Sequence, residues 1–474
     1  MNLATQLTRI LGKDRVASDP TTIATHASDK WFASQNPDVV VFAESADDVS
    51  RVLKFANRHQ IPVTPRGSGF GYVGGCVPIQ GGIALSLARM NKIKEIHFPD
   101  AVAVVQPGVI TGVLQAAAKK KKLFYPPDPA SLKDCSIGGN IATNAGGPRC
   151  LKYGVTRHYV LGLEVVLADG RILRTGGRTH KNKTGFDLIG MFVGSEGLLG
   201  VVTEATLRLL PLPPARATLS ASFRTFREAA NAVQAIFAEG FLPSALEIAD
   251  PFTLAAAGTH LGKILAPSGS AHLLLDLDGQ KASVASEVKS LANLLEKLDA
   301  GGVKTALGEL ACEELWNLRR AFSQSLKATG LPKLNEDIVV PRGRLTDLAL
   351  FTEKLRKKYG FPIACFGHAG DGNIHVNLMA AGYHESRPIK KKVTQALDEL
   401  FAKVLEWGGV ITGEHGIGLA KERWWPQATS SVSRSVHTAL KQALDPQGIL
   451  NPGKFVRTQS ISAQTSEILD SPTP

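Results

Sequence analysis

Short apolar runs separated by polar and glycine-rich stretches mark residues 1–210. The run 39–42 (Val-Val-Val-Phe) is typical of a buried strand, and Ser45-Ala-Asp-Asp48 after it has the pattern of a capping box that opens a helix. Apolar residues at helical spacing follow to Ala56, and 61–64 returns as a strand. Further apolar segments that favour strands lie at 83–87, 101–105, 161–167 and 199–209. The pattern predicts an α+β unit with a β-α-β start.

A proline-rich break, Pro211-Leu-Pro-Pro214, separates this part from the rest of the chain. After it, the hydrophobic spacing predicts helices over 226–237 and 284–298 and strands over 244–248 and 272–278. Strands with helices packed on one face indicate a second domain.

Apolar residues from Val393 to Leu405 predict another helix, which Gly408-Gly409 ends. We therefore expect a four-part organisation: a cofactor-binding domain at 1–214, a substrate or cap domain at 215–425, a C-terminal helical segment at 426–456 that returns to the cofactor-binding domain, and a flexible tail at 457–474.

Charge and composition exclude several classes of protein. Lys+Arg of 54 against Asp+Glu of 42 gives a net charge of +12, with basic runs at 119–122 and 390–392. No aromatic interleaving or nucleic-acid module accompanies them, so we expect solvated helix faces or affinity for an anionic substrate or acidic partner, not nucleic-acid binding. No uninterrupted apolar stretch is long enough to span a membrane, and the N-terminal residues lack the order of a signal peptide. The expected location is the cytoplasm.

The five cysteines, at positions 76, 135, 150, 312 and 365, are odd in number, scattered and never in a Cys-x-x-Cys arrangement. This argues against a disulfide framework, a thiolate zinc site and a bound iron–sulfur cluster. If the protein moves electrons, another molecule must take them onward.

The segment Gly69-Phe-Gly-Tyr-Val-Gly74 satisfies the dinucleotide pattern G-x-G-x-x-G, but further glycines and Pro78 follow it where a helix should begin. We reject a Rossmann site. The backbone N–H groups of the loop 69–74 can still bind a phosphate beside Arg66. The alternative interpretation of this loop is a turn with no ligand. Two more glycine-rich segments, 126–147 and 194–202, favour a long, flat, phosphate-bearing cofactor, with flavin dinucleotide as the leading candidate.

Two short segments are rich in residues that can bind a metal or transfer a proton: Cys365-Phe-Gly-His-Ala-Gly-Asp-Gly-Asn-Ile-His-Val-Asn-Leu378 and Thr412-Gly-Glu-His-Gly416. If 374–378 is a strand, alternation puts His375 and Asn377 on one face, and the flexible 369–372 bends His368 back toward them. With Glu414 this makes two imidazoles and a carboxylate that leave a coordination position open. Zinc is the default divalent ion, and manganese or iron also suits these ligands.

Together these segments resemble the FAD-linked 2-hydroxy acid dehydrogenases, the family of the glycolate dehydrogenase catalytic subunit, D-lactate dehydrogenase and D-2-hydroxyglutarate dehydrogenase. The resemblance covers residues 20 to 456. It implies an α+β fold with a two-part FAD-binding domain of the vanillyl-alcohol oxidase/p-cresol methylhydroxylase type and an antiparallel-sheet, ferredoxin-like cap domain. Because Phe70 and its neighbours include no histidine that could attach the flavin, we expect non-covalent FAD.

The resemblance also implies the residues that contact FAD. The pyrophosphate would lie on Pro65, Arg66, Gly67, Ser68, Gly69, Phe70 and Gly71. The isoalloxazine and ribityl chain would contact Pro127, Asp128, Ser136, Gly139, Asn140, Asn144 and Gly146. The adenine half would approach Glu196, Gly197, Gly200, Val201 and Val202, and Asn451 would return to the flavin.

Three further residues complete the predicted site. His415 is more naturally the base for the hydroxyl proton than a fourth ligand, although it could instead only orient Glu414. Arg319, in Trp316-Asn-Leu-Arg319, resembles the arginine that binds the substrate carboxylate, while its spacing alone suits a surface charge. Asn377 joins them as a predicted catalytic residue. In relatives, a lysine stands just before the acidic residue of the segment that corresponds to 333–341. This chain has no lysine there, and Lys333 or Asn335 would have to take its role, which disfavours a dicarboxylate substrate.

We therefore expect a dehydrogenase that oxidises a small D-2-hydroxy acid, glycolate or D-lactate, to the 2-oxo acid, with metal-assisted deprotonation and hydride transfer to flavin N5. The alternatives are a D-2-hydroxyglutarate dehydrogenase, a flavin-dependent synthase of the ether-lipid type, and a non-catalytic flavin subunit. Electrons would leave through an iron–sulfur subunit, an electron-transfer flavoprotein or a quinone-linked protein, which would place the protein at the inner membrane in part. A homodimer is compatible with the sequence, which does not decide the oligomeric state.

Overall fold

Two compact units form the computed structural model of the protein, which describes residues 2–265, 267 and 269–456. Within these residues the first unit comprises 2–145, 155–211 and 414–456, and the second comprises 146–154 and 212–413. The domain boundaries expected from the sequence stay predictions, and the predicted tail at 457–474 lies outside the described residues.

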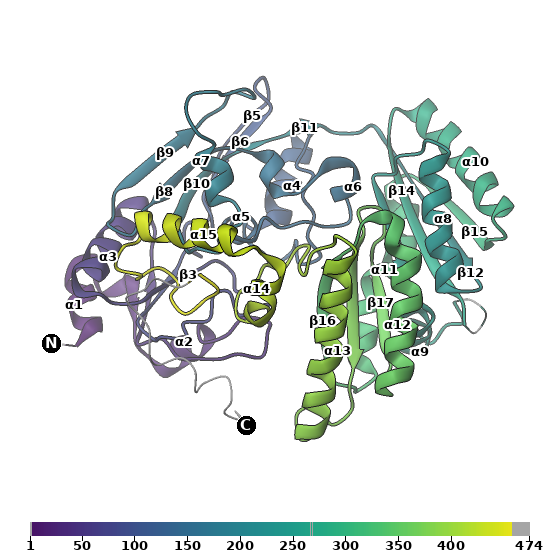
Figure 1. Cartoon of the computed structure of the whole chain (residues 1–474). Coiled ribbons are helices and arrows are strands. Elements are labelled where there is room, and N and C mark those ends of the chain that lie inside the picture. The colour runs from purple at the N-terminus through teal and green to yellow at the C-terminus, as the bar shows by residue number, and fades with distance from the viewer. Residues whose placement is uncertain (1, 266, 268, 457–474) are drawn as a thin grey trace. The chain divides into compact units, whose positions relative to one another are not determined.

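The first unit begins with the expected β-α-β arrangement (Figure 1). Strands β2 (Val39–Phe42) and β3 (Val63–Arg66) both pair in parallel with β4 (Ile83–Ser86), and β1 (Val16–Ala17) adds an antiparallel edge. Helix α3 (Ala46–His59) crosses between β2 and β3. Its N-cap is Ser45, whose hydroxyl accepts from Asp48 N at 3.1 Å, but the Asp48 carboxylate accepts from Glu44 N, one residue earlier than in a reciprocal capping box.

A second, antiparallel sheet completes the core of the first unit. Its strand order is β5 (Ile93–His97), β6 (Val102–Val105), β10 (Val201–Arg208), β8 (Val160–Val166) and β9 (Ile172–Gly176). A two-stranded ribbon pairs β7 (Leu123–Phe124) with β11 (Leu210–Pro211). The remaining helices of this unit before residue 211 are α1 (Leu3–Leu11), η1 (Lys13–Arg15), α2 (Pro20–Thr25), α4 (Thr111–Lys120), α5 (Ile137–Thr143), η2 (Thr156–Tyr159) and α7 (Leu188–Phe192).

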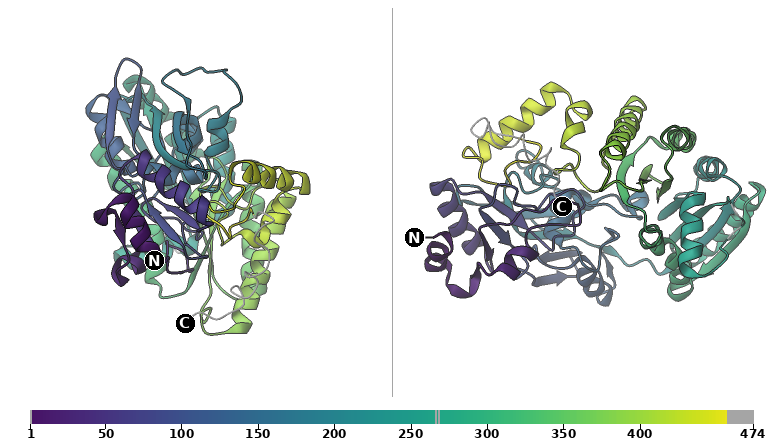
Figure 2. Two further views of the ribbon diagram at one scale, coloured as in Figure 1. Left: turned by 90° about the vertical axis from the view of Figure 1, so that its left-hand side faces the viewer. Right: turned by 90° about the horizontal axis from the view of Figure 1, so that it is seen from below.

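The C-terminal segment returns to the first unit through η4 (Glu422–Trp424), α14 (Trp425–Ala428) and α15 (Ser431–Leu444). Leu450 forms a parallel β-bridge with Val63, and the yellow segment lies beside the purple strands in both views of Figure 2. The buried Lys441 ammonium donates to the carbonyls of Leu198 and Leu450 and to Asp445. These bonds tie the C-terminal stretch 441–450 to Leu198.

The second unit is built on a seven-stranded antiparallel sheet. Its strand order is β15 (Gly301–Leu307), β12 (Ala215–Phe223), β14 (Ala271–Gly279), β13 (Ala245–Ala249), β17 (Ile363–His368), β18 (Asn373–Met379) and β16 (Lys333–Val339). Its helices are α6 (Cys150–Tyr153), α8 (Phe226–Ala238), α9 (Pro251–Leu261), α10 (Lys281–Lys297), α11 (Glu309–Ala328), η3 (Arg342–Arg344), α12 (Leu345–Tyr359) and α13 (Arg387–Glu406).

The two faces of this sheet differ in polarity, because residues paired across neighbouring strands point to the same side. One face carries Leu275, Leu246, Ile248 and their apolar neighbours, and α12 packs on that side with α8. The opposite face is polar in its central rows: it carries His272, Glu247, His368, Asn373, His375, Asn377 and Asp337. Phe322 and Leu326 of α11 and Leu254 of α9 cover part of this polar face with Phe366 and Met379.

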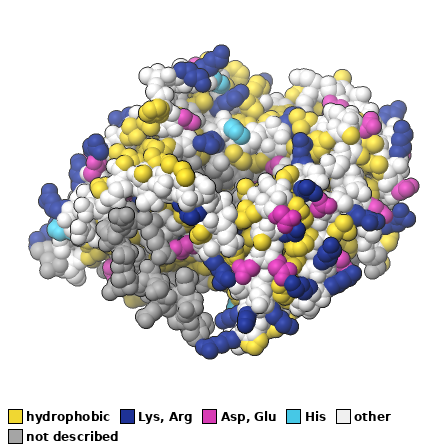
Figure 3. Space-filling model, viewed as in Figure 1, with side chains coloured by type: hydrophobic (Ala, Val, Ile, Leu, Met, Phe, Trp, Pro, Cys, Tyr) yellow, Lys and Arg dark blue, Asp and Glu magenta, His cyan; other side chains and the backbone are white. Residues whose placement is uncertain are grey.

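Positive charge is spread out on the face seen in Figure 3, where Lys and Arg side chains form no single stripe. No helix within the described residues is long and apolar enough to cross a membrane.

Candidate active site

A β-hairpin, β17 and β18, carries both predicted histidine ligands. His368 ends β17 and pairs with Asn373, so that it lies on the same sheet face as His375 one row away. The four-residue loop 369–372 closes with Gly372 N donating to His368 O at 3.1 Å. Gly372 has φ +85, and a Cβ there would lie 2.0 Å from the Val340 carbonyl oxygen. Glycine is therefore required for the turn that brings the histidines together.

His368, His375 and Glu414 form a cluster with the composition of a metal site. One ligand atom of each lies within 4.8 Å of the others, and both histidines are buried, with exposed fractions of 4% and 8%. Two nitrogen or oxygen atoms each about 2.1 Å from one ion are at most about 4.2 Å apart, so this spacing is close to the one that coordination needs. Glu414 follows Gly413, the last residue of the second unit, in the chain.

Asp337 holds the chain in place just before Glu414. This fully buried carboxylate, on β16 opposite His375, accepts from Gly413 N at 2.9 Å, Thr412 Oγ1 at 3.0 Å and Asn373 Nδ2 at 2.7 Å. The hydrogen bonds to Asn373 and Gly413 link the two segments that carry the predicted ligands.

Glu247 of β13 lies behind His368. Its carboxylate is 1% exposed; Oε1 is 2.6 Å from His368 Nδ1 and Oε2 is 2.5 Å from Arg319 Nε. Burial by itself raises the pKa of Glu247, but the charge of Arg319, followed by the interactions with His368, outweighs it and holds the pKa below its ordinary value. An ionised Glu247 that accepts from Nδ1–H leaves the His368 Nε2 lone pair for a metal.

Arg319 reaches the polar face from α11. Glu247 occupies its Nε, and the guanidinium carbon lies 5.0 Å from the Phe366 ring centroid. Its Nη1 and Nη2 have no hydrogen bond to any of the described residues, so the end of the fork is available for a carboxylate. Lys333 lies 5.9 Å from the same ring and donates to Ser323 Oγ at 2.8 Å. Burial lowers the pKa of Lys333 to about 8.

Asn377 lies on the same face as His375, as alternation predicts. Its Nδ2 donates to Ala364 O and His375 O, both at 3.1 Å, and the side chain is fully buried. Its Oδ1, and that of the paired Asn335, meet no hydrogen-bond donor within the part of the chain that the structure describes. Buried acceptors of this kind indicate a bound water or ligand group.

In the first unit, four remote stretches with predicted cofactor residues converge. A Cβ on Gly67 would lie 2.3 Å from Ser136 Oγ, and one on Gly197 would lie 3.4 Å from Pro65. Glu196 accepts from the N–H groups of Ile417 and Gly418, and Asn451 Nδ2 donates to the carbonyls of Gly75 and Glu196. Glu196 and Asn451 both have positive φ, at 50° and 44°. Backbone held in this conformation by buried partners is a mark of a built site.

Comparisons with known proteins identify the family. Residues 212–455 match the family described as FAD linked oxidases, C-terminal domain, and residues 37–176 match the FAD binding domain. A glycolate oxidase subunit of Bacillus subtilis is 41% identical over 419 residues, which cover 88% of this chain and 89% of the relative. The chain belongs to the FAD-linked oxidase family. A D-lactate dehydrogenase of Anaerostipes hadrus is 34% identical, with 94% of each chain covered.

Solved structures confirm the predicted fold class for this FAD-linked oxidase. p-Cresol methylhydroxylase with substrate bound superposes with a TM-score of 0.78 at 20% identity, covering 97% of each chain. Alkyldihydroxyacetonephosphate synthase superposes with a TM-score of 0.74 at 20% identity, covering 96% of this chain and 86% of that one. At these identities the likeness concerns the fold alone.

The glycine-rich loops of the first unit suit FAD, as the family requires. No helix follows Gly69–Gly74, so the rejection of a Rossmann site holds. A Cβ on Gly67 would crowd Ser136, and Gly197 has φ +72, which favours glycine, so both loops lack a side chain where backbone could approach a cofactor closely. Ser136 caps α5, Asn140 donates from Nδ2 to Thr111 Oγ1, and Asn144 Oδ1 accepts from Arg157 N.

Other predicted cofactor residues have different surroundings. Arg66 donates to the carbonyls of Ser28 and Thr25, so its guanidinium holds the 25–28 segment, and the phosphate role falls to the loop backbone as a prediction. Gly146 belongs to the stretch that groups with the second unit. Asp128 and Val201 are buried, and Val202 and Gly200 flank the start of β10. The predicted base His415 stacks on Tyr72, with ring centroids 5.2 Å apart.

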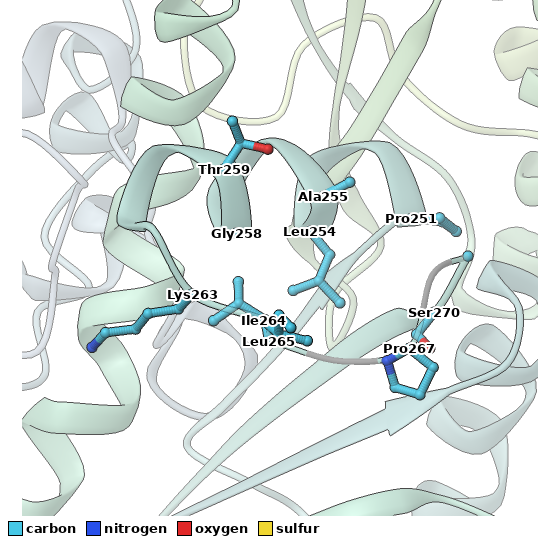
Figure 4. A pocket seen from close by; sticks show the side chains of 11 residues that line it. Pro251, Leu254, Ala255, Gly258, Thr259, Lys263, Ile264, Leu265, Pro267 and Ser270 are labelled. Atoms are coloured by element: carbon cyan, nitrogen blue, oxygen red, sulfur yellow. The ribbon is translucent and has the colours of Figure 1, made fainter.

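Sequence reasoning missed Glu247 and Asp337 as members of the site. Glu247 lies inside the apolar strand Ala-Leu-Glu-Ile-Ala, and Asp337 directly precedes the apolar run Ile-Val-Val; a charge buried in either place needs partners. A cavity beside α9, lined by Leu254, Lys263, Leu265, Pro267 and Ser270 among others, contains none of the predicted residues (Figure 4).

Proposed function

We propose that this FAD-linked oxidase oxidises a small D-2-hydroxy acid, glycolate or D-lactate, to the 2-oxo acid. The observation that carries the proposal is the cluster of His368, His375 and Glu414. Glu247 links this cluster to Arg319, because its carboxylate contacts both His368 and Arg319. Two nitrogens and one oxygen favour zinc, and manganese or iron also accepts them. The similarity to a glycolate oxidase subunit and a D-lactate dehydrogenase supports the substrate class.

When bound, FAD supplies a hydride acceptor and the divalent ion lowers the pKa of the substrate hydroxyl. The chain's own residues bind and orient the acid. Arg319 takes the carboxylate through Nη1 and Nη2 because Glu247 occupies Nε. Asn377 offers the buried Oδ1 to a substrate or water hydrogen. His415 accepts the hydroxyl proton on its imidazole nitrogen.

We also propose that electrons leave through a separate carrier, an iron–sulfur subunit, an electron-transfer flavoprotein or a quinone-linked protein. None of the five cysteines forms a disulfide bond in the part of the chain that the structure describes. The only metal-ligand group found among the described residues uses no cysteine. A net charge of +12 favours docking to an acidic partner. The protein would then work in the cytoplasm, next to the membrane where its acceptor is located.

Anaerobic mixing tests the substrate proposal. FAD-loaded protein is mixed with glycolate, D-lactate, L-lactate or D-2-hydroxyglutarate, and bleaching of the flavin absorbance is followed. Glycolate or D-lactate should bleach the flavin, and L-lactate should bleach it far more slowly. Fast reduction by D-2-hydroxyglutarate alone would favour the dicarboxylate alternative. If no acid reduces the flavin, the proposed dehydrogenase activity is wrong.

A further inference from the structure

We infer that Glu247 is a positioning residue that couples the metal end of the proposed site to its carboxylate end. One carboxylate oxygen lies 2.6 Å from His368 Nδ1, and the other lies 2.5 Å from Arg319 Nε. The inference rests on the proposed function. It adds a residue that sets the tautomer of a ligand and the direction of the substrate-binding fork at the same time.

The burial of all three groups makes the coupling strong. Glu247 and His368 are 1% and 4% exposed, and the Arg319 side chain is 11% exposed, so solvent cannot replace either hydrogen bond. An arginine always donates, so Oε2 must accept. Because a carboxylate has no proton to give, Oε1 also accepts, and His368 must carry its hydrogen on Nδ1. The neutral imidazole of this tautomer is the form that can coordinate a metal ion through Nε2.

A Glu247→Gln substitution separates the hydrogen-bonding role of Glu247 from the space that its side chain fills. The glutamine has nearly the same shape, but only one of its two terminal atoms accepts a hydrogen bond. Its oxygen should face Arg319, the obligatory donor, and its NH₂ should then face His368. That arrangement selects the tautomer with hydrogen on Nε2, which cannot bind a metal through that atom.

Asp276 provides the matched control. It is 1% exposed, lies on the same sheet face, and binds the same helix α11 through Trp316 Nε1 at 2.7 Å, with Arg216 Nε also at 2.7 Å. Asp276→Asn should loosen α11 much as Glu247→Gln does, without touching His368. A defect shared by both variants would therefore come from the helix, not from the coupling.

The test measures Zn²⁺ affinity by competition with a chromophoric chelator, and kcat and KM with the best acid, for wild type and both variants. Glu247→Gln should lower Zn²⁺ affinity 10- to 100-fold and raise KM, while Asp276→Asn should stay within about twofold. The inference is overturned if Glu247→Gln binds Zn²⁺ like wild type. An equal loss of Zn²⁺ affinity in Asp276→Asn also overturns it. A lower KM in Glu247→Gln overturns it too, because it would mean that Glu247 only neutralises the charge of Arg319.

If Glu247→Gln does not fold, a measurement on the wild type still tests the inference. In the zinc-free protein, ¹⁵N chemical shifts should show His368 with a hydrogen on Nδ1, and a neutral ring with its hydrogen on Nε2 alone contradicts the inference. Failure of the proposed function looks different: the wild type would then take up no Zn²⁺ and no acid would reduce its flavin, even with the expected tautomer.

Discussion

At the scale of single residues, the polar face of the second unit depends on buried charges that satisfy each other. Arg319 has one side of its fork committed to Glu247 and the other side open, which fixes the plane in which a carboxylate can bind. A lysine in its place would keep the positive charge and lose that plane. Charge and geometry can therefore be tested separately.

Arg319→Lys should raise KM for the hydroxy acid by about 10- to 100-fold, the equivalent of about 1.4–3 kcal/mol of lost carboxylate recognition. The matched control is Arg320→Lys, because Arg320 is the next residue on α11, is exposed and pairs with Glu313. Its KM should not change. Steady-state kinetics with both variants checks this, and equal KM values for wild type and Arg319→Lys would remove Arg319 from the substrate site.

His272 makes stability depend on pH. Burial, followed by the charges of Arg319 and Lys304, lowers the pKa of His272 to about 4 from its ordinary 6.5. The unfolded chain therefore binds the proton first as pH falls, and the folded state loses up to about 3 kcal/mol between pH 6.5 and pH 4. His272→Asn removes this dependence. Burial raises the pKa of Asp250 to about 6, which makes the folded state gain stability as pH falls. This contribution is the same in the wild type and in His272→Asn, so it cancels in their difference.

The measurement is the difference in free energy of unfolding between wild type and His272→Asn, from urea titrations at several pH values. Above pH 7 the difference should be constant, and below pH 6.5 the advantage of the wild type should shrink. A difference that does not change with pH would mean that His272 is not held neutral in the folded protein.

At the scale of elements, the β17–β18 hairpin determines where the two histidines lie. Local pattern was enough to predict the strand after residue 373 and the shared face of His375 and Asn377, because alternation is a property of one strand. It could not place Glu247, because β13 pairs with β17 across more than a hundred residues of sequence. Which face a strand buries follows from its partners, and these long-range pairings are absent from local spacing.

Gly372→Ala should destabilise the second unit by about 3 kcal/mol or more, since its Cβ would meet the Val340 carbonyl oxygen in addition to the strain of a positive φ. Gly382→Ala is the control: its φ is +73, but nothing lies within 4 Å of a Cβ there, so it should cost about 1 kcal/mol. Urea unfolding and Zn²⁺ content compare the two. Equal costs would show that the hairpin tolerates the added carbon.

At the scale of the whole molecule, the first unit is closed by chain from both ends of the sequence. Composition and motif order predicted the fold family and a C-terminal segment that returns to the cofactor-binding domain, but not the individual bonds that hold residues 414–456 there. Those bonds use buried charge. Lys441 and Asp445 are 2% and 0% exposed, and Asp445 also accepts from the N–H groups of Ile449 and Leu450. An ion pair this deep is costly to break from one side, because the remaining charge has no water.

Lys441→Met should therefore lower the stability of the first unit by about 3–5 kcal/mol, seen as release of FAD at lower urea concentration. A second change, Asp445→Asn in the same chain, should recover part of this loss because it removes the stranded charge. Zn²⁺ affinity should stay within about twofold in both variants if His368, His375 and Glu414 keep their places without the Lys441–Asp445 pair. A parallel loss of FAD and Zn²⁺ would instead show that the C-terminal segment supports both units, because the chain that carries Glu414 continues directly into it.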